Sequence, residues 1–143
     1  MSKQVLLVED DAAIMETLSM FLNYEGYEVL RARSVAQAIE VLRIQSPDVV
    51  LLDYMLQDGT AEPVVVELRT LYEDRVKVIL LTAADDPSGK GRTVGADAVV
   101  AKPFELDGLL ATLRSCLDWG KQPWRLNQIS TKPESVTNTV FLS

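Results

Sequence analysis

Four short segments of the chain are continuously apolar and do not alternate between apolar and polar residues. Runs of this length are typical of strands that are covered on both faces, as in a parallel sheet. A further segment, residues 27–31, does alternate, which predicts an edge strand. The four continuous runs are Val5-Leu6-Leu7-Val8, Val49-Val50-Leu51-Leu52, Val76 to Leu81 and Ala98 to Ala101.

Between and after these strands, apolar residues recur with helical spacing. Gly26 supplies a stop for the first predicted helix, Ser34 is a candidate N-cap for the second, and Pro63 fits only in the first turn of the third. Because strands and helices alternate, the sequence predicts an α/β sheet with right-handed crossovers. The four apolar helix faces are Ile14, Leu18, Phe21 and Leu22; Val35, Ala38, Ile39 and Leu42; Ala61, Val64, Val65 and Leu68; and Leu106, Leu109, Leu110, Leu113 and Leu117.

Residues 85–94 are the weakest predicted helix. The segment contains one proline, two glycines and little apolar periodicity. Since an interior glycine costs a helix about 1 kcal/mol relative to alanine, we expect a short, frayed or mobile element here. The composition becomes polar after Trp119, and residues 120–143 are expected to form a C-terminal tail or a linker stub.

Length and composition limit the classes of function. A chain of 143 residues suffices for one domain with its own core, and not for two. It contains no histidine and only one cysteine, Cys116, which excludes an internal disulfide, a His-ligated zinc site and a Ser-His or Cys-His dyad. The formal net charge of −7 argues against direct nucleic-acid binding, and no apolar run is long enough to span a membrane. With no signal peptide at its start, the chain is expected to be a soluble cytoplasmic domain.

Charged and hydroxyl side chains follow the predicted strands. Glu9-Asp10-Asp11 comes directly after the first strand and Asp53 ends the third, while Thr82 ends the fourth and Lys102 follows the fifth. In an open parallel sheet, ligands bind beyond the carboxyl ends of the strands. If the first and third strands are neighbours, three or four carboxylates crowd one small crevice.

Crowded carboxylates need protons or a cation, because two unit charges 4 Å apart repel by about 4 kcal/mol at an effective dielectric constant near 20. Oxygen ligands without histidine or cysteine select a hard cation, Mg²⁺ with Mn²⁺ as the alternative. A metal ion held by few carboxylates keeps positions open for phosphate oxygens and can template phosphoryl transfer. In that chemistry Asp53 is the candidate nucleophile, Thr82 the hydroxyl donor to a phosphoryl oxygen, and Lys102 the countercharge.

Each of these residues also has an ordinary structural interpretation. Asp10 or Asp11 is equally suited to cap the next helix. An aspartate at a strand end is commonly a turn residue, a lysine there is commonly solvated, and Thr82 is an acceptable strand terminus. The functional interpretation gains its weight because all four features fall at the same end of successive strands.

The order and spacing of several motifs resemble those of response-regulator receiver domains. The resemblance covers residues 3–119. We take residues 1–119 as the receiver domain and residues 120–143 as a C-terminal tail or linker stub. It implies a doubly wound, flavodoxin-like sheet of five parallel strands in the order 2-1-3-4-5. The matching segments are Val5-Leu6-Leu7-Val8-Glu9-Asp10-Asp11, Val50-Leu51-Leu52-Asp53-Tyr54-Met55-Leu56, Leu80-Leu81-Thr82-Ala83, Gly95-Ala96-Asp97 and Ala101-Lys102-Pro103-Phe104.

The resemblance also implies a site and its partners. Asp53 is expected to accept a phosphoryl group from a histidine kinase or a histidine phosphotransfer protein. A second copy of the chain, in a homodimer, is a further expected partner. Mg²⁺ is expected to be held by Asp10, by Glu9 through water, by Asp53 and by the backbone carbonyl of Met55. Thr82 and Lys102 would contact the phosphoryl group, and the peptide bond between Lys102 and Pro103 is expected to be cis. Such a protein catalyses only its own phosphorylation and dephosphorylation, and we do not class it as an enzyme.

The sequence departs from the family pattern, which keeps alternatives open. Val99 stands at the switch position, where the family usually has an aromatic residue, and Gln57 replaces a usual proline. Together with the weak fourth helix, Val99 favours an alternative function, a pseudo-receiver that acts as a phosphorylation-independent scaffold. A phosphatase of the haloacid dehalogenase type is disfavoured, because its general acid would fall at Met55.

Overall fold

Strands and helices alternate along the chain as the hydrophobic pattern predicts. The computed structural model describes residues 2–83, 89, 91 and 94–119. Its elements, in chain order, are β1 (Gln4–Val8), α1 (Ala12–Tyr24), β2 (Glu28–Ala32), α2 (Val35–Ile44), β3 (Val49–Asp53), β4 (Met55–Leu56), β5 (Gly59–Thr60), α3 (Glu62–Tyr72), β6 (Lys77–Thr82), β7 (Ala98–Ala101) and α5 (Leu106–Trp119).

The five longer strands form one parallel sheet in the order β2-β1-β3-β6-β7. Since β6 and β7 correspond to the fourth and fifth predicted strands, this confirms the expected order 2-1-3-4-5. The alternating segment lies at the edge as β2. The first and third predicted strands are neighbours, with Val8 paired to Leu52. The carboxyl ends of β1 and β3 therefore lie side by side.

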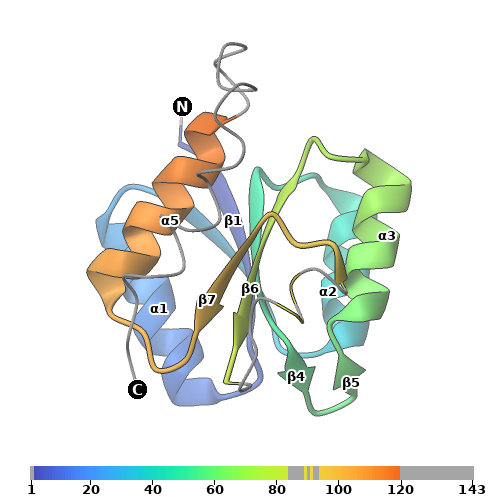
Figure 1. Cartoon of the computed structure of the whole chain (residues 1–143), viewed down its shortest axis with the longest axis horizontal. Helices are drawn as coiled ribbons and strands as arrows, with labels where there is room; N and C mark the ends of the chain where they lie inside the picture. Colours follow the sequence, from blue (N-terminus) through green and yellow to red (C-terminus); the bar gives the residue numbers. More distant parts are fainter. Residues whose placement is uncertain (1, 84–88, 90, 92–93, 120–143) are drawn as a thin grey trace.

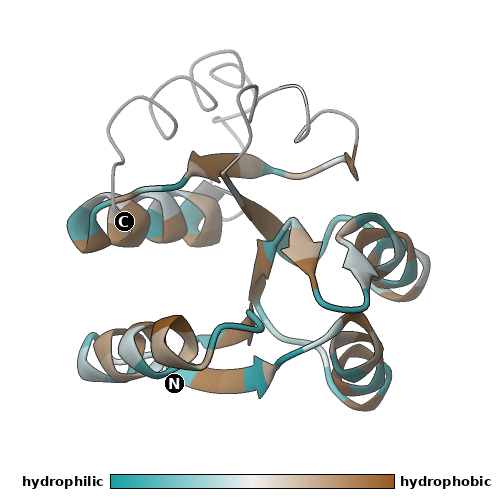
Figure 2. Ribbon diagram, turned by 90° about the horizontal axis from the view of Figure 1, so that it is seen from below, coloured by the Kyte–Doolittle hydropathy of each residue, from teal (hydrophilic) through white to brown (hydrophobic). Residues whose placement is uncertain are grey.

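Helices cover both faces of this sheet. Figure 1 shows α1 and α5 on one side and α2 and α3 on the other, and Figure 2 looks onto the lower edge of the same arrangement. Successive residues of β1 alternate between the two layers: Val5 and Leu7 pack with α1 and α5, whereas Leu6 and Val8 pack with α2 and α3. All four side chains are fully buried, which explains why the strand is continuously apolar.

The predicted helix boundaries have the expected local causes. Ser34 caps α2, since its side chain accepts a hydrogen bond from the backbone N–H of Gln37. Pro63 lies in the first turn of α3, where its missing N–H is not needed. Gly26 follows α1 with a φ of 97°, a left-handed conformation that glycine adopts without steric cost.

Two parts of the chain differ from or lie beyond the sequence predictions. A small antiparallel hairpin, β4–β5, directly follows β3 and was not predicted. In the segment of the expected fourth helix, residues 85–94, the structure describes Gly89, Gly91 and Val94, and all three are helical. The other residues of this segment lie outside the described residues. The predicted tail, residues 120–143, also lies outside the described residues.

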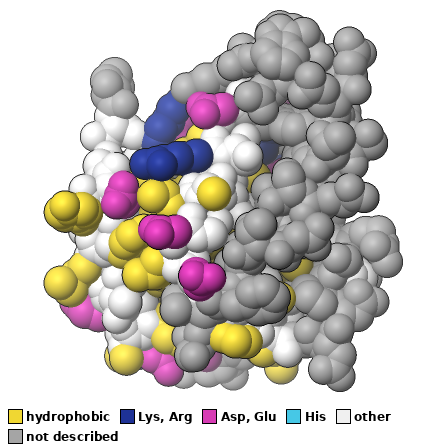
Figure 3. Space-filling model, turned by 60° about the vertical axis from the view of Figure 1, so that its left-hand side comes forward, with side chains coloured by type: hydrophobic (Ala, Val, Ile, Leu, Met, Phe, Trp, Pro, Cys, Tyr) yellow, Lys and Arg dark blue, Asp and Glu magenta, His cyan; other side chains and the backbone are white. Residues whose placement is uncertain are grey.

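Helix α1 carries two large exposed hydrophobic side chains. On α1, Met20 and Tyr24 are one turn apart, and both are largely exposed. Figure 3, in which the left-hand side of Figure 1 comes forward, shows hydrophobic side chains close to acidic ones on this face.

Arg69 of α3 joins the starts of β6 and β7 at the edge opposite the carboxyl ends. One of its terminal nitrogens, Nη1, donates to the carbonyl oxygens of Glu73 at 3.0 Å and Val76 at 2.9 Å. The other, Nη2, donates to the carbonyl oxygen of Gly95 at 3.1 Å and to Asp97 Oδ2 at 3.0 Å. The same carboxylate oxygen accepts the backbone N–H of Val78 at 2.8 Å, so one side chain ties α3, β6 and β7 together.

We expect Arg69→Ala to lower the free energy of unfolding by roughly 2–3 kcal/mol, because it leaves a half-buried carboxylate and several carbonyl oxygens without their charged donor. Chemical denaturation monitored by circular dichroism measures this loss. Arg43→Ala is the matched control, since Arg43 pairs with Glu67 at the surface and its loss should change stability far less. Equal effects of the two substitutions would contradict the assignment.

Candidate functional site

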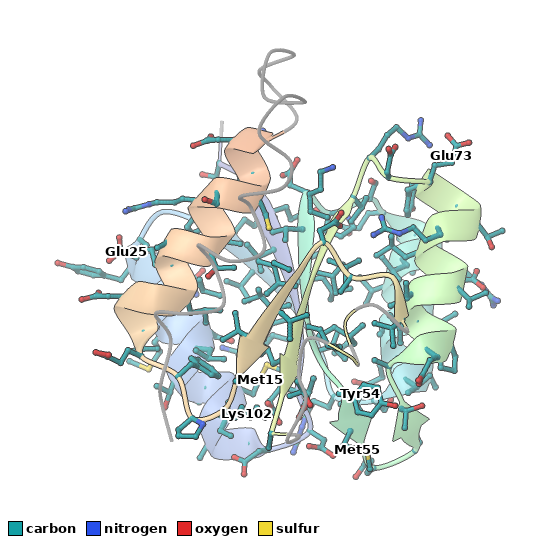
Figure 4. All side chains as sticks on the ribbon, in the orientation of Figure 1. Met15, Glu25, Tyr54, Met55, Glu73 and Lys102 are labelled. Carbon is teal, nitrogen blue, oxygen red and sulfur yellow. The ribbon has the colours of Figure 1, made fainter. Side chains whose placement is uncertain are left out.

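Residues that follow four strands come together at the carboxyl edge of the sheet. The pairing of Val8 with Leu52 places Glu9 beside Asp53, and the pairing of Thr82 with Ala101 places Thr82 next to Lys102. Figure 4 shows Lys102 and Met55 at this same lower edge, although they come from opposite parts of the sequence. The topology thus gathers the strand-end residues that the sequence singled out.

Three carboxylates form the centre of the site. Glu9, Asp10 and Asp53 each offer one oxygen, and these three oxygens all lie within 4.8 Å of one another. Glu9 and Asp53 are buried, with 1% and 7% of their surface exposed, whereas Asp10 is half-buried. Acidic side chains with so little access to water need a positive charge near them.

Lys102 supplies a positive charge from the protein itself. Its Nζ lies 3.3 Å from Glu9 Oε1 and 3.2 Å from Asp53 Oδ2, so that one ammonium group contacts both buried carboxylates. The backbone N–H of Lys102 donates to the carbonyl of Thr82 at 2.8 Å, which fixes the start of the loop. The bond between Lys102 and Pro103 is cis, as expected.

Burial and charge shift the pKa values of Glu9 and Lys102. Burial, reinforced by the negative charge of Asp53, raises the pKa of Glu9 above its ordinary 4.5, although the backbone N–H of Asp11 and the ammonium of Lys102 both oppose this. Burial by itself would lower the pKa of Lys102. The carboxylates of Asp53 and Glu9 outweigh that effect and raise it above 10.5. Lys102 is therefore charged at neutral pH.

The two neighbouring aspartates after β1, Asp10 and Asp11, have different structural roles. Asp11 is the N-cap of α1: its Oδ1 accepts the backbone N–H of Ile14 at 3.0 Å. Its own N–H donates to Glu9 Oε2 at 3.0 Å. The capping interpretation is thus correct for Asp11, while Asp10 lies in the carboxylate cluster.

Thr82 and Met55 lie at the edge of this cluster. Thr82 is the last residue of β6 and is buried. Met55 begins the β4–β5 hairpin two residues after Asp53, and its side chain is exposed. Contact of the Thr82 hydroxyl with a phosphoryl group, and of the Met55 carbonyl with a metal ion, stay predictions.

The switch position is filled by a buried aliphatic side chain. Val99 of β7 belongs to the cluster on the α2 and α3 side of the sheet, with 8% of its surface exposed. A Cβ on Gly91 would overlap the Cγ2 atom of Val99, so the glycine permits a close approach of backbone to strand. At this position the side chain is packed in the core.

Sequence reasoning missed the residues that hold the loop after Asp53. Glu62 accepts hydrogen bonds from the hydroxyl of Tyr54, at 3.0 Å, and from the hydroxyl of Thr60. The bond from Tyr54 to Glu62 raises the pKa of the tyrosine. Asp58 reaches the N-terminus of α2 and accepts the backbone N–H groups of Val35 and Ala36. The Asp-Gly pair at 58–59 is the sequence signal that could have indicated a turn here.

The donor set fits a small hard cation. The ligand atoms that the cluster offers are carboxylate oxygens, and these are close enough to share one ion. The charge of three carboxylates exceeds that of the one ammonium, Lys102, that contacts them. Glu9, Asp10 and Asp53 are the residues that would hold Mg²⁺.

Comparisons with known proteins match most of the described residues. The family model of the response regulator receiver domain matches residues 5–114. The chain is 39% identical over 115 residues to the "Probable transcriptional regulatory protein TcrX" of Mycobacterium tuberculosis, a match that covers 79% of this chain and 49% of TcrX. The chain thus spans about half the length of the curated relatives it matches.

Solved structures give the same result. The non-phosphorylated HemR receiver domain from Leptospira biflexa is 30% identical with a TM-score of 0.73, and the match covers 81% of this chain and 94% of that one. The response regulator TrrA from Thermotoga maritima, solved in complex with Mg²⁺-BeF, is 31% identical with a TM-score of 0.73, covering 80% and 99% of the two chains.

In the described part of this chain, no helix is long and apolar enough to cross a bilayer.

We expect Mg²⁺ to raise the midpoint of thermal unfolding, because an ion that binds only the folded state stabilises it, by about 2.7 kcal/mol at 100 times its dissociation constant. The pKa of Glu9 is raised above 4.5, so protons compete with the ion at pH values near this pKa. The stabilisation by Mg²⁺ should be complete at pH values well above the pKa of Glu9, and it should be lost as the pH falls through that pKa. In metal-free protein the pH dependence is opposite: the free energy of unfolding falls as the pH rises through the pKa of Glu9, because ionisation of this buried carboxyl is less favourable in the folded state.

Differential scanning calorimetry with and without MgCl₂ across this pH range measures both trends. Asp10→Asn should remove most of the Mg²⁺-dependent shift, whereas Asp107→Asn, an exposed residue of α5, should keep it. A shift of the same size in both variants would contradict the assigned cation site.

Proposed function

Because the chain belongs to the response regulator receiver domain family of two-component signal transduction, we propose that it accepts a phosphoryl group on Asp53 from a phosphohistidine partner in an Mg²⁺-dependent reaction. Membership of this family also means that the chain is a signalling module and not a conventional enzyme. A histidine kinase is the partner that the family implies. The finer assignment to Asp53 is supported by its position, buried at the end of β3 beside two other carboxylates.

The chemistry follows from the nucleophile and its neighbours. A carboxylate oxygen of Asp53 attacks the phosphorus of the donor phosphoimidazole, the P–O bond forms, and the P–N bond breaks as the imidazole leaves and takes up a proton. When bound, Mg²⁺ neutralises charge on the phosphoryl oxygens. Lys102, already charged and 3.2 Å from Asp53 Oδ2, is placed to exchange a carboxylate contact for a phosphoryl oxygen. Thr82, at the end of β6, would donate its hydroxyl to another.

The single observation that carries the proposal is the contact of one ammonium with two buried carboxylates. Glu9, Asp53 and Lys102 are 44 to 93 positions apart in the chain, counted between pairs, and meet only at this edge. A turn residue, a helix cap and a solvated lysine would not need this meeting. The three ordinary interpretations taken together therefore explain less than the phosphoacceptor function.

A second candidate function rests on Val99. Its core packing against Gly91 favours a pseudo-receiver that docks without phosphorylation, because a valine has no ring to move between buried and exposed positions. We place it second, since Glu9, Asp10, Asp53, Thr82 and Lys102 are all present. For the first candidate we propose that phosphorylation switches docking or homodimerisation, without direct contact of this chain with nucleic acid or membrane.

Incubation with a small phosphodonor and MgCl₂ tests the proposal. We expect intact-protein mass spectrometry to show the addition of one phosphoryl group, lost on chelation of the metal and absent in Asp53→Asn. Asp107→Asn, which changes an exposed aspartate of α5, is the control and should be modified like the wild type. Modification of Asp53→Asn to the same extent would overturn the phosphoacceptor assignment, and no modification of the wild type would favour the pseudo-receiver.

A further inference from the structure

We propose that Arg33 and Asp58 are positioning residues that hold two loops, those carrying the proposed Mg²⁺ ligands Asp10 and Met55, against the N-terminus of α2. This inference rests on the proposed function, since one loop carries Asp10 and the other carries Met55. Neither Arg33 nor Asp58 lies in the carboxylate cluster. Their role would be to set where the ligands stand.

Arg33 fastens the loop after β1. Its Nη2 donates to the backbone carbonyl of Asp10 at 3.1 Å. Its own backbone is held in turn, because its N–H donates to the side-chain oxygen of Gln37 at 2.8 Å, in the first turn of α2. Glu9, the residue before Asp10, is fixed by the bond from its N–H to the carbonyl of Ala32 at 3.0 Å. The Asp10 peptide is thus tied to the end of β2 and the start of α2.

Asp58 fastens the loop after β3. It lies between β4 and β5, and its two carboxylate oxygens accept the backbone N–H of Val35 at 2.8 Å and of Ala36 at 3.2 Å. These donors lie in the first turn of α2, where they have no carbonyl partner within the helix and where negative charge is favoured. Figure 1 shows the hairpin beside the lower ends of α2 and α3.

The hairpin links this contact to the proposed ligand. Met55 opens β4 and pairs with Thr60, while Gly59 of β5, with a φ of 150°, approaches the side chain of Val35. The other side of the hairpin is held by the bond from Thr60 to Glu62. The direction of the Met55 carbonyl is therefore set by a strand whose tip is fixed on α2. One helix end holds both loops.

Capping of α2 alone would be a simpler role for Asp58, and the chain offers a control for it. Ser34 caps the same helix through Gln37 without touching either loop. Charge gives a second control. Arg31, two positions before Arg33, pairs with Glu16 at 3.6 Å, whereas the bond to the Asp10 carbonyl comes from Arg33. Removing Arg31 therefore takes away a positive charge near the site and leaves the Arg33–Asp10 bond in place.

Isothermal titration of the purified full chain with MgCl₂ tests the inference. Removing a positive charge near a cation site should by electrostatics alone tighten Mg²⁺ binding. We expect the opposite for Arg33→Ala, a dissociation constant increased on the order of 10-fold, as is typical when a residue supporting a metal ligand is lost. Arg33→Lys should recover part of the affinity, since one ammonium still reaches one carbonyl. Asp58→Ala should also weaken binding, and since the lost negative charge acts in the same direction there, Arg33→Ala is the variant that separates positioning from charge.

The controls separate this result from its alternatives. Ser34→Ala should lower the unfolding midpoint yet keep the wild-type Mg²⁺ affinity, and Arg31→Ala should bind Mg²⁺ at least as tightly as the wild type. If Arg33→Ala and Asp58→Ala bind Mg²⁺ like the wild type, the positioning role is wrong while the proposed function stands. If the wild type itself takes up no Mg²⁺, the proposed function fails first.

Discussion

One ammonium group shared between two buried carboxylates is the interaction on which the site depends. Lys102 contacts Glu9 and Asp53, which lie 93 and 49 positions earlier in the chain, and the order of the strands brings the three together. Burying charges in this way is costly, and a buried ion pair is rarely a means of gaining stability. The cluster is therefore better explained by chemistry than by folding. The remaining excess of negative charge is what makes a divalent cation a fitting partner.

Most of the fold could be predicted from the sequence because a two-sided sheet leaves a simple pattern. Strands that are buried on both faces read as unbroken apolar runs, as Val5 to Val8 do, and the edge strand β2 reads as an alternating one. Helix limits such as Ser34 and Pro63 depend on neighbours a few positions away, so local chemistry predicted them. The strand-end residues then follow from topology, which places Glu9 and Asp53 at one edge.

The rest could not be predicted because it depends on contacts between distant residues whose types are not distinctive. Nothing in the local sequence says that Asp58 caps a helix that begins 23 positions earlier, or that Arg33 meets the carbonyl of Asp10. The β4–β5 hairpin is too short for its periodicity to be recognised. For Asp10 and Asp11 the sequence allowed both capping and metal binding, and only the fold separates them: Asp11 caps α1, and Asp10 joins the cluster.

We propose that the carboxylates of this edge share one divalent cation next to a reactive aspartate. A crystal structure of the protein grown with MgCl₂ and beryllofluoride is the decisive test. We expect beryllofluoride on an oxygen of Asp53, with Lys102 beside a fluorine and Mg²⁺ bound to Asp10 and Asp53. Beryllofluoride and metal absent from this edge, with Glu9, Asp53 and Lys102 still in mutual contact, would contradict it.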